Sequence, residues 1–335
     1  MIGRIIAVLP LVAAWLPYSQ AEEEAAKATL EAVVWAAPGR WQLFTNNPVL
    51  RPGAKGEWDA GALGSMSVLK VDEVFHMYYE AWGGRGGQSA DYLSLQIGHA
   101  TSRDGLHWSK DPASPVLPKG TGQDWDRDGT WDPFVLYENG LFKMWYGGGE
   151  NTHCEWGYAV STDGAHFVKK GQISHLGNVE DDHVVHDHVT RSYFMYYWDR
   201  KQEPKGLFRA QSLNETAFDF AHAEPIHIDG LPRNSMYKFT HVLQDRGQWL
   251  MFFAEFVRPG CKGCWTGYAT SPDGSRWQAQ NRQLLLGQDA EVLKVADDLY
   301  FMYYGPDGYF DQKGCDIRLA VHKGTLGAAA LKEAE

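Results

Sequence analysis

A short pattern that places methionine among aromatic residues occurs five times in this chain of 335 residues. Its copies are FHMYY (75–79), FKMWY (142–146), YFMYY (193–197), WLMFF (249–253) and YFMYY (300–304). Successive copies start 67, 51, 56 and 51 residues apart. Such self-similarity is the sequence signature of a repeat architecture, in which each repeat is one supersecondary unit packed against the next.

A second pattern follows each copy of the first. Its copies are IGHATSRDGLHW (97–108), WGYAVSTDGAHF (156–167), GLFRAQSLNETAFDF (206–220), TGYATSPDGSRW (266–277) and the truncated IRLAVHKG (317–324). Three copies contain Ser-x-Asp-Gly-x-x-aromatic, and Asp-Gly is expected to supply the positive φ angles of a tight hairpin turn. Five copies of a four-stranded unit predict an all-β fold, a single five-bladed β-propeller over residues 41–324. A β-sandwich, the alternative, does not require five matched strands.

The last repeat lacks an obvious outermost strand after residue 324. Residues 41–50 (WQLFTNNPVL) are expected to provide it, so that an N-terminal strand closes the ring and removes an exposed sheet edge. The register of the repeats places the inner strand of each blade near one of five residues: Ser65, Asp132, Asp182, Phe239 and Asp289.

The two ends of the chain are expected to lie outside the propeller. Arg4, the apolar run 5–15 and Ser19-Gln20-Ala21 form the three parts of a signal peptide, residues 1–21, cleaved after Ala21. The protein is therefore expected to be exported to the periplasm or secreted. Residues 22–40 are a lead-in segment, and residues 325–335 are a C-terminal tail.

The charge of the chain restricts its partners. It has 31 Lys plus Arg against 42 Asp plus Glu, a net charge of −11, and an isoelectric point near 5.6. Without runs of Lys or Arg, this balance argues against nucleic acid as a partner, and no later segment is apolar enough to insert into a membrane. The sequence does not indicate an oligomeric state.

The chain resembles a known superfamily in several segments. They are WDPFVLYENGLFKMWYGG (131–148), GYAVSTDGAHF (157–167) and the lead-ins that start with NPVL (47–50) and SPVL (114–117). The superfamily is the five-bladed propeller glycosidases, comprising glycoside hydrolase families 32, 43, 62, 68, 117 and 130. The resemblance implies a carbohydrate substrate bound in an axial pit, with acidic residues at the starts of inner strands serving as base, acid and pKa modulator. It assigns Asp132 to the Asp-Pro element of the second blade and Asp182 to its counterpart in the third.

The chain departs from the family pattern at two points. Ser65 stands where a carboxylate is expected in the first blade, with Asp59 the nearest acid, and no Glu-Gly-Pro or Glu-Cys element marks the usual acid. Glycoside hydrolysis requires two carboxyl groups, and crowding raises the pKa of one of them. The candidate catalytic residues are Asp59, Asp132, Asp182, Glu180 and Glu291. Asp126 aligns with Asp59. For both residues, the alternative interpretation is a role in structuring the loop.

Other side chains are expected to bind the sugar. Polar groups at strand ends suit hydrogen bonds to hydroxyl groups, and tryptophans stack on the apolar face of a sugar ring. The candidate binding residues are Trp131, His183, Lys238, His241, Glu255, Asp289, Glu80, Trp82 and Trp198.

Metal binding is the main alternative chemistry. The stretch 182–188 holds three histidines, of which His186 and His188 share one strand face. The cysteines are Cys154, Cys261, Cys264 and Cys315; in an exported protein they suit disulfides, with Cys315 pairing with Cys261 or Cys264, or Cys261 with Cys264. No cofactor is expected for a glycosidase, although a structural cation is compatible with the stretch. Two alternative functions follow: a carbohydrate-binding propeller without catalysis, and a metal-dependent enzyme that uses this stretch or the cysteines.

Overall fold

The computed structural model describes residues 40–83, 95–150, 153–201, 206–232, 236–256, 264–306 and 316–326. These residues are mostly β-strand, and the only helical turn among them is the 3₁₀ helix η2 (Phe220–His222). The all-β prediction is confirmed. None of the described segments forms a helix long and apolar enough to cross a membrane. The predicted signal peptide and nearly all of the lead-in and tail lie outside the described residues.

Three sheets of four strands follow one another along the chain. The first contains β2 (Ala62–Val71), β3 (Val74–Trp82), β4 (Gln96–Ser102) and β5 (Ser109–Lys110). The second contains β6 (Thr130–Glu138), β7 (Leu141–Glu150), β8 (His153–Ser161) and β9 (Val168–Gln172). The third contains β10 (Val179–Asp187), β11 (Ser192–Asp199), β12 (Gly206–Ser212) and β13 (Glu224–Pro225).

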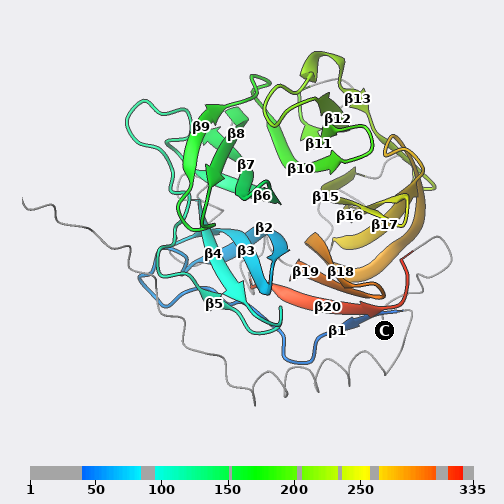
Figure 1. Cartoon of the computed structure of the whole chain (residues 1–335), viewed down its shortest axis with the longest axis horizontal. Helices are drawn as coiled ribbons and strands as arrows, with labels where there is room; N and C mark the ends of the chain where they lie inside the picture. Colours follow the sequence, from blue (N-terminus) through cyan, green and yellow to red (C-terminus); the bar gives the residue numbers. More distant parts are fainter. Residues whose placement is uncertain are drawn as a thin grey trace, which may run out of the picture.

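The remaining strands form one eight-stranded sheet. Its members are β1 (Trp41–Leu43), β14 (His227–Asp229), β15 (Met236–Asp245), β16 (Gln248–Phe256), β17 (Trp265–Ser271), β18 (Arg276–Ala296), β19 (Leu299–Pro306) and β20 (Arg318–Lys323). The long β18 pairs with β17 through its first half and with β19 through its second, and so joins two groups of strands. Strand β1 pairs antiparallel with β20, so the two ends of the described chain meet in one sheet. Figure 1 shows the sheets arranged around a common centre, with β2, β6, β10, β15 and β18 facing it.

The repeated aromatic pattern forms the second strand of each group, namely β3, β7, β11, β16 and β19. Its methionines, Met77, Met144, Met195, Met251 and Met302, are fully buried. Aromatic and β-branched residues favour strands because they pack well on a pleated surface that is covered on both faces. These strands therefore supply the hydrophobic core between neighbouring sheets, as expected from the sequence.

The Ser-x-Asp-Gly turns differ from the predicted hairpin geometry. In the first of them only Gly105 has a positive φ, +74°, while Asp104 does not. The Asp104 carboxylate instead accepts hydrogen bonds from the backbone N–H groups of Leu106 and His107, at 2.8 and 2.9 Å. The aspartate thus fixes the turn through its side chain, as in an Asx-turn, rather than through a left-handed backbone.

Each of these turns is held by a tyrosine from the preceding sheet around the ring. Tyr78 of β3 donates to the carbonyl of Gly164 at 2.9 Å, and Tyr196 of β11 donates to that of Gly274 at 2.7 Å. Tyr303 of β19, in the last group of strands, donates to Gly105 in the first sheet at 2.8 Å. The repeated tyrosines therefore link neighbouring sheets, and the last of these bonds links the end of the ring to its beginning.

Replacing Tyr303 by phenylalanine tests this link. Tyr303→Phe removes one buried donor and leaves the Gly105 carbonyl without it, so the free energy of unfolding is expected to fall by about 1–2 kcal/mol in urea denaturation. The control is Tyr137→Phe, at a side chain that is 42% exposed, where a change within about 0.5 kcal/mol is expected. Equal stabilities of the two variants would contradict the link.

Candidate active site

Every inner strand carries a β-bulge at the same level of the ring. The register against the adjacent strand shifts between Leu63 and Met66, Trp131 and Phe134, Glu180 and His183, Lys238 and His241, and Gln288 and Glu291. The first bulged residue of each strand is Gly64, Asp132, Asp181, Phe239 or Asp289. Bulges re-aim side chains and are frequent beside functional sites.

Three of these bulges place an aspartate in the left-handed region. The φ angles are +43° at Asp132, +57° at Asp181 and +53° at Asp289. Among residues with a side chain, aspartate and asparagine tolerate this conformation best. The pairing corrects the sequence alignment by one residue: Asp181 matches Asp132, whereas Asp182 matches Pro133. Because residues 180–182 are all acidic, the sequence alone does not show which of them matches Asp132.

The same correction applies to the first sheet. Gly64, rather than Ser65, matches the aspartates, and Ser65 follows it in the bulge. The first inner strand therefore contributes a hydroxyl group to the centre, where three of the other four inner strands contribute carboxylates. The Ser65 hydroxyl donates to Asp289 Oδ1 at 3.3 Å.

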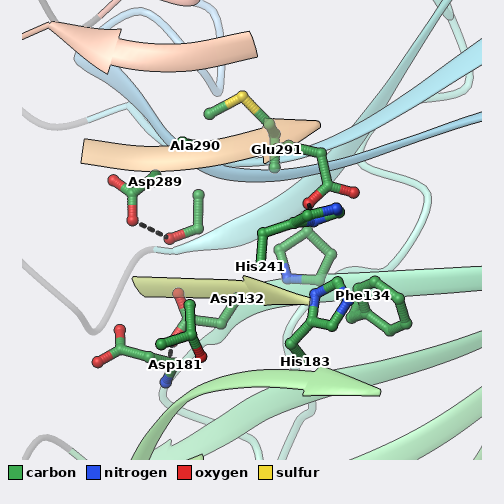
Figure 2. Close-up of a pocket in the computed structure, with 12 residues that line it drawn as sticks. Asp132, Phe134, Asp181, His183, His241, Asp289, Ala290 and Glu291 are labelled. Carbon is green, nitrogen blue, oxygen red and sulfur yellow. Dashed lines mark hydrogen bonds and ion pairs between the residues drawn. The ribbon is translucent and has the colours of Figure 1, made fainter. Parts of the chain in front are cut away.

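The aspartates line a small cavity at the centre of the ring, of about 40 Å³. It is lined by Ser65, Met66, Asp132, Pro133, Phe134, Asp181, His183, Thr240, His241, Asp289, Ala290 and Glu291. Figure 2 shows the three aspartates gathered at one end, and the imidazoles of His183 and His241 with Glu291 and Phe134 at the other. A volume of this size holds a water molecule beside the carboxylates.

The carboxylates are connected by hydrogen bonds that run from one strand to the next. The Asp181 N–H donates to Asp132 Oδ2 at 3.4 Å, and the Asp132 N–H donates to Glu80 Oε2 at 3.0 Å. Lys238 approaches these carboxylates, with its Nζ 3.6 Å from Asp181 Oδ2. Glu80, predicted as a binding residue, is only 4% exposed and so acts on the cluster from beneath.

Burial and mutual repulsion raise the pKa of all three aspartates. Desolvation is the largest cause for each, followed for Asp132 by the charge of Glu80, and the pKa of Asp132 rises to about 8. The pKa of Asp181 also rises to about 8, although the Lys238 charge opposes the shift. The pKa of Asp289 is raised well above its usual value by desolvation and then by Glu80 and Asp132. A cluster of this kind holds protons at neutral pH that ordinary carboxyl groups have lost.

The other end of the cavity is a belt of side chains that joins the inner strands. Glu291 accepts from the Val68 N–H at 3.1 Å and interacts with His241 Nδ1 at 2.6 Å. His183 Nε2 donates to the Val242 carbonyl at 2.8 Å, and its ring lies 4.4 Å from that of His241. Glu291, His183 and His241 are 5%, 3% and 7% exposed. The belt thus connects neighbouring strands and forms the floor beneath the aspartates.

Glu180 lies just outside the cavity lining, in an ion-pair cluster. It pairs with Arg200 and with Lys238, the latter at 2.6 Å. Two cations therefore adjoin the acidic cluster, although the sequence shows no run of basic residues. Arg200 was not predicted from the sequence. It directly follows β11, and no local sequence pattern indicates that its side chain approaches the site.

Asp59 is placed away from the cavity lining. It pairs with Lys110 and accepts from Tyr79 at 3.4 Å. Asp126 repeats this arrangement in the second sheet, with Lys169 at 2.6 Å and Tyr146 at 3.1 Å. Each aspartate anchors a lead-in loop to two strands, which matches the loop-structuring alternative for both residues.

Four of the remaining candidates are buried, namely Trp82, Trp131, Trp198 and Glu255. Trp82 and Trp131, 8% and 5% exposed, pack in one cluster with Cys154. Trp198 lies under Lys238, whose Nζ is 5.5 Å from the ring centroid. Glu255 in β16 is 1% exposed, and Asp182 belongs to β10. Cys154 and Cys264 are buried, whereas Cys261 and Cys315 lie outside the described residues, so the disulfides stay a prediction.

Two groups of described residues have metal-ligating atoms within 4.8 Å of one another. One is His183, His241 and Glu291 in the belt, and the other is Glu138, His186 and His188 at the far ends of β6 and β10. In the first group, His241 Nε2 is buried without a hydrogen-bond partner among the described residues. Both groups include histidines of the stretch 182–188.

Comparison with known proteins connects the chain to carbohydrate-active enzymes. No protein-family model matches the sequence. A segment is 30% identical over 106 residues to a 1,2-beta-oligomannan phosphorylase of Thermoanaerobacter sp. (strain X514), covering 31% of this chain and 34% of that protein. Another is 28% identical over 178 residues to sucrose-6-phosphate hydrolase of Escherichia coli, covering 47% and 35%. The matches thus span about a third of the length of these relatives.

Solved structures match over most of the chain. A beta-1,2-mannobiose phosphorylase from Listeria innocua aligns with a TM-score of 0.65 at 12% identity, over 84% of this chain and 96% of that one. A thermostable family-43 glycoside hydrolase aligns with a TM-score of 0.58 at 15% identity, over 79% and 90%. A family-43 beta-xylosidase/alpha-arabinofuranosidase from a compost metagenome gives 0.61 at 13%, over 86% and 97%. The chain therefore has the fold of these glycoside hydrolases and phosphorylases, and the resemblance stated from the sequence is confirmed at that level.

The raised pKa values predict how stability depends on pH. The unfolded chain releases the Asp132 proton near pH 4, whereas the folded protein retains it to about pH 8, so this residue destabilises the fold increasingly as pH rises between these values. Asp132→Asn, which also tolerates a positive φ, is expected to be more stable than the parent at pH 8 by at least about 1 kcal/mol, and the gain is expected to shrink toward pH 4.

Urea denaturation at four pH values from 5 to 8 checks this expectation. The control is Asp297→Asn, at a fully exposed side chain, which is expected to change stability by less than about 0.5 kcal/mol throughout. A loss of stability in Asp132→Asn at pH 8 would show that the carboxylate is ionised and well paired in the fold.

Proposed function

We propose that the protein is a glycosidase whose catalytic carboxyl groups are Asp132, Asp181 and Asp289. The observation that carries the proposal is the convergence of these three residues, each held at positive φ in the bulge of a different strand, on one small cavity. Backbone strain and raised pKa values concentrate at functional sites. The fold shared with glycoside hydrolases and phosphorylases supports the reaction class.

The electrostatic surroundings suggest a division of roles. Asp181 lies beside Lys238, which favours its ionised form, so Asp181 is the base or nucleophile. Burial and the charges of Glu80 and Asp132 raise the pKa of Asp289, and together they outweigh the hydrogen bond from Ser65, which lowers it. Asp289 therefore keeps its proton and is the general acid. Asp132 lies in hydrogen-bond contact with Asp181 and sets the balance between the two. Opposite protonation states in one site are what glycoside cleavage requires.

The acceptor of the glycosyl group is water in this proposal. The small cavity beside the carboxylates accommodates a water molecule. Phosphate is the alternative acceptor, since Arg200 and Lys238 lie at the edge of the acidic cluster and two similar proteins carry phosphorylase in their names. Both cations pair with Glu180, which favours hydrolysis because phosphate would have to displace that carboxylate.

Two further features belong to the proposal. We infer a five-bladed propeller in which β18 is shared by the last two blades and β1 completes the final one; the pairing of β1 with β20 supports this closure. Residues 1–21 are proposed to direct export and to be removed, which fits a polysaccharide- or oligosaccharide-degrading enzyme that meets its substrate outside the cytoplasm. N-terminal sequencing of the protein purified from its host tests the cleavage.

Substitution of the proposed catalytic residues tests the activity. The parent is screened on β-1,2-mannooligosaccharides, xylo- and arabino-oligosaccharides and sucrose 6-phosphate, with and without inorganic phosphate. Asp181→Asn and Asp289→Asn are each expected to lower kcat by about 10²–10⁴-fold while the fold is retained. The control Asp126→Asn, at a loop anchor, is expected to affect stability more than turnover. Free sugar as product supports hydrolysis, whereas a sugar phosphate shows phosphorolysis.

The pH dependence of kcat/KM provides a separate test. The alkaline limb reports loss of the proton of Asp289 and is expected well above the pH at which an ordinary carboxyl group titrates, because burial and neighbouring carboxylates raise the pKa of this residue. Lys238→Met removes the charge that lowers the pKa of Asp181, so the acidic limb is expected to move to higher pH. An unchanged acidic limb would assign the base to another residue.

A sugar-binding protein without catalysis is the alternative, favoured by Gly64 and Ser65, which leave the first inner strand without a carboxylate at its bulge. It predicts saturable binding of an oligosaccharide in calorimetry with no product after prolonged incubation. In that case Asp181→Asn changes the binding affinity alone.

A further inference from the structure

A second cluster of polar side chains lies at the opposite end of the inner strands. It consists of Glu138 at the end of β6 and His186 and His188 at the end of β10, and it is called here the distal cluster. Asp132 and Glu138 are six residues apart on one strand, which corresponds to about 20 Å at ~3.3 Å per residue. The distal cluster is therefore separate from the proposed catalytic carboxyl groups.

The cluster brings together three side chains of the types that bind transition metals. Ligand atoms of Glu138, His186 and His188 lie within 4.8 Å of one another. His186 lies near the end of β10 and His188 lies in the turn that follows this strand, and their ring centroids are 4.4 Å apart. His186 Nδ1 lies 2.5 Å from Glu138 Oε1. Tetrahedral zinc keeps its ligands about 3.3 Å apart, so a bound ion requires these two atoms to separate by roughly 1 Å.

Neighbouring residues already orient the carboxylate. Glu138 Oε2 accepts from Tyr193 at 2.7 Å and from Lys143 at 2.8 Å, which leaves Oε1 directed to His186. The Tyr193 ring also stacks on His186, with centroids 4.2 Å apart and planes at 9°. Residues that hydrogen-bond to a metal ligand, or pack on it, and so fix its orientation are typical of metal sites.

The charges of the cluster suit a cation. Lys143 bonds to Glu215 at 2.7 Å as well as to Glu138, so one lysine is shared by two carboxylates. One negative charge therefore remains uncompensated beside two imidazoles. His186 is 20% exposed and His188 is exposed, so an ion can enter from solvent.

The cluster lies in the lining of a second cavity, larger than the one beside the aspartates. This cavity has a volume of about 470 Å³ and is walled by the valine and leucine pairs of the five inner strands, with Glu138, His186 and His188 in its lining. It shares Phe134, His183, His241 and Glu291 with the small cavity, so the belt separates the two. A metal held by three protein ligands at this place keeps a coordination position open to the cavity.

We propose that Glu138, His186 and His188 bind one divalent transition-metal ion of the Zn²⁺ type at the end of the ring opposite the acidic cluster. Two imidazoles and one carboxylate are a ligand set used for zinc and for other ions of this group. The ion connects β6 to β10, and thus two neighbouring sheets, in addition to the existing hydrogen bonds.

Titration of the metal-free full chain with Zn²⁺ tests the site. After treatment with EDTA and dialysis, the parent is expected to bind Zn²⁺ with a dissociation constant in the micromolar range or below, and its melting temperature is expected to rise. His188→Ala removes an exposed ligand without disturbing the core, so it is expected to bind one Zn²⁺ fewer and to lose the rise in melting temperature. Co²⁺ in place of Zn²⁺ is expected to give visible d–d absorption in the parent that is absent in His188→Ala.

The matched control is His166→Ala, another exposed histidine paired with a carboxylate, which is expected to behave like the parent. Equal Zn²⁺ stoichiometry in the parent and in His188→Ala would place the ion elsewhere and overturn the proposal. Absence of Zn²⁺ binding to the parent would overturn it as well. Neither result bears on the catalytic role of the aspartates, because they belong to the other end of the strands.

Discussion

The structure depends on joining each group of strands to the next around one axis. Tyrosine hydroxyl groups of one sheet bind turn carbonyls of the following sheet, and Tyr303 makes the same bond between the last group and the first. Between the second and third sheets, the indole N–H of Trp145 makes the equivalent link by donating to the carbonyl of Glu215 at 2.8 Å. The last two groups need no such bond because β18 passes through both. These links hold neighbouring groups of strands together around one centre, so residues far apart in sequence meet there.

The meeting of the inner strands explains the unusual chemistry of the centre. Three aspartates are brought together at positive φ, and desolvation together with the charges of neighbouring carboxylates raises their pKa values. Such an arrangement is unfavourable for folding at neutral pH, and proteins tolerate it where activity requires it. The rest of the ring supplies the compensating stability through its buried aromatic strands. The same physical feature thus connects the fold to the proposed reaction.

The axis has two ends with different character. The carboxylates lie on one side of the belt of Glu291, His241 and His183, beside which Phe134 packs. An apolar cavity lies on the other side, with the distal cluster in its lining. The belt explains why Glu291, although acidic and central, is a poor candidate for catalysis. Its carboxylate is engaged by Val68 and His241 and holds three strands together.

The sequence by itself determined the periodic part of the protein. The five Met-aromatic copies defined the strands that form the core, since residues of this type require burial on both faces and repeat at the length of one sheet. Asp132 and Asp289 were also among the residues predicted from the sequence, Asp132 as a catalytic residue and Asp289 as a binding residue, because each lies near the start of an inner strand. The tertiary structure alone decided which residue of the acidic run 180–182 enters the site. A bulge adds one residue to a strand and so shifts the pairing of every later side chain by one position. The residue types around a bulge do not show in the sequence where this shift occurs. The pairing of Asp59 with Lys110, and the approach of Arg200 and Lys238 to the acidic cluster, likewise depend on contacts between strands that the sequence does not place side by side.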